Sequence, residues 1–259
     1  MTTASAKGLQ PRWPQSLAFL LGHHYSSRMS TNREISLAIA SESNISSVIP
    51  GEFLRTPPFR FDFSKKNPDI QHVDMSDANT LQKYIDETFA KNGKTWGLGG
   101  YNEERFFYEK SELFRSGNEY RSIHLGLDIW LPAGTPLSSP LPARVHSFQN
   151  NAHFLDYGPT IILEHDVTDI VFWTLYGHLS AESLEGLFEG KKIASGERFA
   201  TLGAPPINGS WPPHVHWQVI GDLFEKKGDY PGVVTPSERE KYLAVCADPE
   251  ILLTSFLAT

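Results

Sequence analysis

Residues 157–177, YGPTIILEHDVTDIVFWTLYG, decide the fold that this sequence predicts. Two runs rich in β-branched and aromatic residues, Thr160–Glu164 and Ile170–Leu175, are separated by Asp166–Asp169, which is typical of a hairpin connection. Similar short runs lie on either side, at Ala143–Phe148 and His214–Ile220. The second half of the chain is therefore predicted to be mainly β, as an antiparallel β-sheet in a sandwich or in a barrel-like arrangement.

The segments around this sheet have a different texture. Pro57–Phe63 alternates aromatic and polar residues like a short strand, whereas Asp77–Lys91 has apolar residues at helical spacing, with Asp77 as the N-cap. Near the end, Thr235–Val245 and residues 248–257 predict short C-terminal helices, the first with a capping box. We expect an N-terminal α+β extension over residues 1–110 and the β domain over residues 111–259.

Composition limits the classes of function. The chain has 259 residues, 40% of them hydrophobic, so it can bury a sizeable core. A net charge of −7 disfavours nucleic acid or an anionic membrane surface as the main partner. The single cysteine, Cys246, excludes an internal disulfide and a cysteine-rich zinc site, which leaves imidazole and carboxylate groups as candidate metal ligands. The oligomeric state is not predicted.

The N-terminus gives a weak signal for targeting. The apolar run Ser16–Gly22 is short for the core of a signal peptide, and residues 1–33 contain no Asp or Glu, a composition loosely like that of a transit peptide. No stretch approaches the roughly 20 apolar residues of a membrane span. We expect a cytoplasmic protein, with an exported or organellar location as the alternative.

The closing motif His214-Val215-His216 lies in a predicted strand. Residues two apart in a strand point to the same face about 6.5 Å apart, so both imidazoles lie on one face and Val215 and Trp217 on the other. This separation suits one metal ligand and one neighbour of a bound water. A pair of histidines on a solvated sheet face is the alternative interpretation.

His124 and Asp128 form a second pair. In a straight strand their Cα atoms would be about 13 Å apart, too far to share an ion. The chain must therefore bend between them, and Gly126 can allow the bend. Alone, the pair is also explained by a histidine at a strand start followed by a turn.

Together these residues indicate a catalytic metal site. Two neutral imidazoles and one carboxylate leave a fourth zinc position for water, whose pKa the ion lowers. No His-Glu-x-x-His motif supplies a glutamate base, so His178 and His214 are the candidates to take a proton from water or to stabilise an oxyanion. Tyr176 is a possible hydrogen-bond donor near the site or a core residue.

The motifs resemble those of the lysostaphin or LytM-type zinc metalloendopeptidases, which have His-x-x-x-Asp, a later Tyr-x-His-Leu-Ser and a closing His-x-His. The resemblance covers roughly residues 120–222 and implies a mainly β metallopeptidase domain that cleaves a peptide at a site in a groove. It implies Zn²⁺ as the cofactor. The implied zinc ligands are His124, Asp128 and His216, and the implied catalytic pair is His178 and His214.

Two features separate this sequence from the usual family pattern. The glycine-rich segment before the last motif is replaced by Gly203–Pro213. The prolines of this segment are expected to stiffen the wall of the groove, and Trp211 is expected to narrow the groove. Three segments are similar to the peptidase-like domain that lies between a kinase-like and an aminotransferase domain in some fusion enzymes: Leu155–His165, Gly196–Gly203 and Asn208–His214. The alternatives to an endopeptidase are therefore an intracellular zinc hydrolase of a small amide or amino-compound and a catalytically idle binding domain. Residues 1–110 are expected to pack beside the groove and partly cover it.

Overall fold

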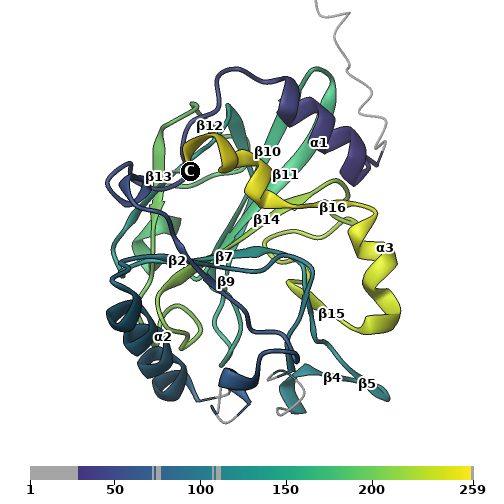
Figure 1. Cartoon of the computed structure of the whole chain (residues 1–259). Helices are drawn as coiled ribbons and strands as arrows, with labels where there is room; N and C mark the ends of the chain where they lie inside the picture. The colour runs from purple at the N-terminus through teal and green to yellow at the C-terminus, as the bar shows by residue number, and fades with distance from the viewer. Residues whose placement is uncertain (1–28, 72, 74–76, 107, 109–111, 258–259) are drawn as a thin grey trace, which may run out of the picture.

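A computed structural model of the chain describes residues 29–71, 73, 77–106, 108 and 112–257. Within them the fold is mainly β, around one nine-stranded sheet (Figure 1). The strands are β1 Phe59–Phe61, β2 Gly97–Gly99, β3 Glu103–Glu104, β4 Arg115–Ser116, β5 Glu119–Tyr120, β6 Ile123–His124, β7 Leu127–Trp130, β8 Pro136–Ser138, β9 Ala143–Asn151, β10 Gly158–Val167, β11 Ile170–Gly177, β12 Lys192–Ile193, β13 Arg198–Thr201, β14 His214–Ile220, β15 Val233–Val234 and β16 Cys246–Ala247.

Helices are few and short among the described residues. The α-helices are α1 Asn32–Ser41, α2 Ala78–Asn92 and α3 Arg239–Leu243. Single 3-10 turns lie at Phe53–Arg55, Pro68–Ile70, Glu112–Phe114, Ala181–Leu184, Pro236–Glu238, Pro249–Leu252 and Thr254–Phe256. Figure 1 shows α2 and α3 on opposite sides of the molecule.

The main sheet confirms the predicted antiparallel core. Its order is β1-β2-β7-β14-β11-β10-β9-β12, with β16 also paired to β14. β10 and β11 form the predicted hairpin, because Val167 pairs with Ile170 and the two residues between them, Thr168 and Asp169, have φ values of 50° and 64°. The barrel-like alternative is wrong for the described residues, since this order runs from β1 to β12 without closing.

The helix predicted after Asp77 is confirmed, whereas the predicted helix over residues 248–257 is two 3-10 turns. α2 follows Asp77, whose side chain accepts the N–H of Thr80 over 3.0 Å, and it ends at Gly93 in the left-handed conformation. The segment after Thr235 is shorter than predicted: a 3-10 turn with a capping box to Glu238 leads into α3. α1 was not predicted, although Thr31 and Glu34 form a capping box at its start.

Two strands from before position 110, β1 and β2, belong to the main sheet. β1 pairs parallel with β2, and β2 pairs antiparallel with β7. α1 packs against β11 and β16, where Ile35 and Ile39 are fully buried. The division at residue 110 stays a prediction.

Three apolar clusters fill the interior of the part of the chain that the structure describes. The largest lies on the face of β14 that carries Val215, Trp217 and Val219. A second joins aromatic residues of the N-terminal segment, such as Phe61 and Phe63, to Trp130 and Trp211 near the opposite face. A third, which includes Tyr157 and Tyr230, packs against β15 and α3.

The described helices include none that is both long and apolar enough to cross a membrane. The candidate targeting segment, residues 16–22, lies outside the described residues.

Candidate metal centre

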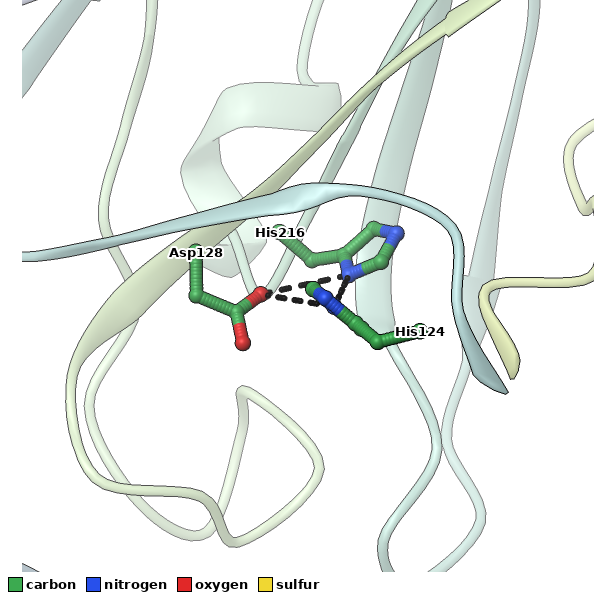
Figure 2. A group of neighbouring side chains, drawn as sticks. All are labelled: His124, Asp128 and His216. Carbon is green, nitrogen blue, oxygen red and sulfur yellow. Dashed lines mark hydrogen bonds and ion pairs between the residues drawn. The ribbon is translucent and has the colours of Figure 1, made fainter. Parts of the chain in front are cut away.

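Three side chains from three strands converge on one point (Figure 2). His124 ends β6, Asp128 lies in β7 and His216 lies in β14. β7 and β14 are antiparallel neighbours in which Asp128 is directly opposite His216. One ligand atom of each side chain lies within 4.8 Å of the other two. The bend between β6 and β7 therefore brings the predicted pair together.

The three atoms have the spacing of ligands around one tetrahedral ion. His124 Nε2 lies 3.0 Å from His216 Nδ1, and Asp128 Oδ1 lies 3.2 Å and 3.3 Å from these two nitrogens. Metal–ligand bonds of zinc length, about 2.0–2.1 Å, place neighbouring tetrahedral ligands about 3.3 Å apart. The three distances therefore match those between the ligands of a tetrahedral zinc ion.

Hydrogen bonds leave a lone pair on each of the converging atoms. His124 Nδ1 donates to the carbonyl of Gly100 over 2.8 Å, so its Nε2 carries the lone pair. His216 Nε2 donates to Gln218 Oε1 over 3.1 Å, and the Gln218 amide is oriented by its own donation to the Pro231 carbonyl. Two lone pairs then face each other beside a carboxylate, an arrangement that a cation satisfies.

One oxygen of the Asp128 carboxylate accepts a hydrogen bond and the other does not. Its Oδ2 accepts from Arg105 Nη1 over 2.7 Å, while its buried Oδ1 has no hydrogen-bond partner. An orphaned buried carboxylate oxygen is costly unless an ion satisfies it. Burial would raise the pKa of the Asp128 carboxyl, but His124 and Arg105 hold it well below its usual range. The group is therefore an anion ready to bind a cation.

Two further histidines stand next to the triangle. His178 Nδ1 donates to the carbonyl of Asn208 over 2.9 Å, and His214 Nδ1 donates to that of Pro212 over 2.7 Å. Their rings are 4.3 Å apart, and His214 Nε2 lies 3.9 Å from Asp128 Oδ1. Each ring therefore has a free Nε2 lone pair on the side away from its carbonyl anchor.

Burial keeps these imidazoles neutral. It lowers the pKa of His124 and of His214 to about 4, and it lowers the pKa of His178 well below its ordinary value. Trp130 stacks on His214, with ring centroids 4.2 Å apart and an interplanar angle of 25°. At neutral pH both His178 and His214 can accept a proton.

The local backbone of His178 is unusual. Its φ is 62°, in the left-handed region that residues with a Cβ seldom adopt. The conformation is held on both sides, because the His178 N–H donates to the Tyr157 carbonyl over 2.7 Å and the His178 carbonyl accepts from Gly203 over 2.9 Å. The chain is thereby turned out of β11 at the point where the imidazole meets the metal-ligand triangle.

A cavity of about 520 Å³ contains the whole set. All five predicted site residues line it, and each is only 1–5% exposed. Phe63 and Tyr108 of the N-terminal segment form part of the wall, and Trp211 forms another part. The expectation that this segment packs beside the groove agrees with these contacts.

The reason that glycine occupies position 126 differs from the predicted one. The chain does turn there, between β6 and β7, but φ of Gly126 is not in the left-handed region. A Cβ at this position would lie 2.6 Å from His216 Cε1 and 2.8 Å from the Trp217 carbonyl oxygen. Glycine is required here because β14 and the His216 ring approach so closely.

Sequence reasoning missed the residues that support the ligands. Arg105 and Glu103 come from a segment with no recognisable motif, whereas Gln218 could have been found because it lies two residues after His216 on the same strand face. Tyr176 is buried in the largest apolar cluster, which agrees with the alternative of a core residue.

Comparison with known proteins gives a family match for part of the chain. Residues 122–228 match the sequence model of peptidase family M23, which confirms the resemblance that the motifs indicate. Comparison with curated proteins gives no match.

Similar solved structures include several peptidases. The catalytic domain of lysostaphin, an antimicrobial peptidase from Staphylococcus simulans, is 19% identical, with 52% of this chain and 97% of that chain covered and a TM-score of 0.33. The catalytic domain of a prophage-encoded M23 protein from Enterococcus faecalis is 25% identical, with 48% and 83% covered and a TM-score of 0.33. A zinc-containing peptidase from Vibrio cholerae is 23% identical, with 38% and 27% covered and a TM-score of 0.29. The chain thus spans little more than a quarter of the Vibrio peptidase.

Proposed function

We propose that the peptidase family M23 match at residues 122–228 marks this chain as a zinc-dependent metallopeptidase that hydrolyses an amide bond. His124, Asp128 and His216 would hold the ion, and His178 and His214 would move protons. The observation that carries the proposal is the triangle of three lone-pair atoms, 3.0–3.3 Å apart, one of them the orphaned Asp128 Oδ1.

The chain's own residues supply the proton chemistry. A bound zinc ion would polarise the scissile carbonyl and lower the pKa of the attacking water. His178 and His214 each present a neutral Nε2, since both Nδ1 atoms donate to main-chain carbonyls. One of them would take the proton from water, and the resulting imidazolium would stabilise the tetrahedral oxyanion before it returns the proton to the leaving amine.

Metal analysis combined with a substrate panel tests the proposal. Protein purified without chelator should contain about one equivalent of zinc, and excess chelator should remove both metal and activity until zinc is restored. Glycyl peptides, cell-wall muropeptides and small amides form the panel. A folded protein that contains no metal and takes up none on titration with Zn²⁺ contradicts the proposal.

The burial of the site favours a second candidate, a zinc hydrolase acting on a small amide or amino-compound. All five site residues are at most 5% exposed, and the cavity around them has the volume of a small-molecule site, within roughly 300–1,000 Å³. In the same panel this candidate predicts turnover of small amides and none of muropeptides. A catalytically idle binding domain predicts metal uptake without turnover of any member.

A cytoplasmic location is part of the second candidate. It stays a prediction from the sequence, as does the similarity to the peptidase-like domain of fusion enzymes.

A further inference from the structure

We infer that Arg105, held by Glu103, is a positioning residue that fixes the Asp128 carboxylate for metal binding. The guanidinium is 2% exposed; its Nη1 donates to Asp128 Oδ2 over 2.7 Å and its Nε donates to Glu103 Oε2 over 2.8 Å. Glu103 is fixed in turn, because its Oε1 accepts the backbone N–H of Phe63 over 2.9 Å. The inference rests on the proposed metal site.

The contact decides which oxygen of Asp128 faces the imidazoles. Arg105 occupies Oδ2, and the carboxylate then presents Oδ1 to His124 and His216 with no competing donor. A carboxylate free to rotate would have to be ordered by the ion itself, at a cost in affinity. Arg105 therefore acts on the metal through Asp128.

The residues that hold two of the metal ligands in place lie outside the region that matches the family. β2 lies beside β7 with Gly99 opposite Asp128, and β3 lies beside β6 with Glu103 opposite His124. The carbonyl of Gly100, between these strands, accepts from His124 Nδ1. Residues 97–105 thus hold two of the three ligands, although the family match begins at residue 122.

Removal of Arg105 should change Zn²⁺ affinity in opposite directions through its charge and through its effect on the orientation of Asp128. Loss of a positive charge beside a cation site would by itself strengthen binding of Zn²⁺. Loss of a fixed carboxylate orientation would weaken it. Because Arg105 and Glu103 carry opposite charges, replacing both leaves the net charge unchanged and tests orientation alone. The sign of the change in affinity therefore identifies the role.

The experiment measures Zn²⁺ affinity of the full chain by competition with a colorimetric chelator. Arg105→Gln and the double variant Arg105→Gln/Glu103→Gln are expected to bind Zn²⁺ about 10–100-fold more weakly. Arg105→Lys should recover part of the loss, since lysine keeps the charge but cannot form the same fork between two carboxylates. Arg60→Gln is the matched control, because Arg60 pairs with Glu250 on the surface away from the cavity.

Melting temperature in excess chelator reports the fold without metal. A merely structural Arg105 would lower that temperature and leave Zn²⁺ affinity unchanged. Unchanged or tighter binding by folded Arg105→Gln and by the double variant overturns the inference; if Arg105→Gln does not fold, the double variant and Arg105→Lys decide by the same criterion. If the wild-type chain binds no Zn²⁺, this result contradicts the proposed function and not the role of Arg105.

Discussion

At the residue scale, one nitrogen of each site imidazole donates a hydrogen bond to an oxygen atom, which leaves the lone pair on the other nitrogen. His124, His178 and His214 donate through Nδ1 to main-chain carbonyls, whereas His216 donates through Nε2 to Gln218. The nitrogen that carries the lone pair is therefore Nε2 in three rings and Nδ1 in one. His216 lies on the strand next to Asp128, and its Nδ1 faces the proposed metal position.

Two histidines in the same motif should respond differently to substitution. His216→Ala removes a proposed ligand, so the protein should lose its zinc together with its activity. His214→Ala should keep zinc and lose about 10²–10⁴-fold in kcat, because only proton transfer is affected. Metal content and hydrolysis rate are measured on both variants.

His146→Ala serves as the control, since His146 contacts Ser147 outside the cavity and should change neither quantity. Loss of zinc from His214→Ala would contradict the assignment of roles.

His165 gives a prediction for stability against pH. It is buried, its Nδ1 donates to the Pro142 carbonyl over 3.1 Å, and its Nε2 accepts from the Thr174 hydroxyl over 2.7 Å, so the ring is neutral. Burial lowers its pKa from 6.5 to about 4. Between these values the unfolded chain binds more protons, so this contribution to stability is present above pH 6.5 and is lost as the pH falls toward 4.

From pH 7.5 to 4.5, the loss due to His165 should be about 2–3 kcal/mol in the free energy of unfolding. His165→Gln should therefore lose less stability than the wild type over this range, by that amount. Urea denaturation at fixed metal concentration measures both. Parallel pH profiles for the two proteins would show that the prediction is wrong.

At the element scale, the strands could be predicted because their chemistry is local. Alternating β-branched and aromatic residues with a two-residue turn specify β10 and β11 without reference to the rest of the chain. The same periodicity correctly places His214 and His216 on one face. β3 has only two residues, so no periodicity could reveal it, and Arg105 beside it reaches Asp128 only in the folded chain.

The turn between β6 and β7 depends on a missing side chain. Gly126→Ala would place a methyl group 2.6 Å from His216 Cε1 and 2.8 Å from a backbone oxygen that cannot move independently. The His216 ring must shift, so zinc affinity should fall about 10-fold or more, and overpacking should cost about 1–3 kcal/mol of stability. Chelator competition and urea denaturation measure the two effects.

Gly51→Ala is the matched control, because a Cβ there meets nothing within 4 Å. Wild-type zinc affinity in folded Gly126→Ala would contradict the close approach.

At the scale of the whole molecule, the region of the family match does not complete its own core. β1 and β2 extend the sheet from one end of the chain, and β16 pairs with β14 from the other. The sequence predicts an extension packed beside a groove, but it could not show that the extension is joined by backbone hydrogen bonds. Such pairing depends on partners about 30 residues or more apart, such as Gly97 and Trp130, and local patterns do not encode it.

α1 provides a matched pair of positions for testing this dependence. Ile39 is 0% exposed in the largest apolar cluster, whereas Leu37 on the same helix is 62% exposed. Ile39→Ala should lower the free energy of unfolding by about 2–5 kcal/mol, and Leu37→Ala should change it by less than about 0.5 kcal/mol. Urea denaturation measures both, and equal effects would contradict the packing of α1 on the core.

The carbonyl anchors of His124, His178 and His214 also have a genetic consequence. The groups that hold these rings belong to the main chain of Gly100, Asn208 and Pro212, and every amino acid supplies a carbonyl. A point mutation at an anchor position cannot delete the accepting atom; it can only displace it by moving the loop. Inherited variation could therefore change the side chains around the cavity, and with them substrate choice, while the imidazoles keep the same protonated nitrogen.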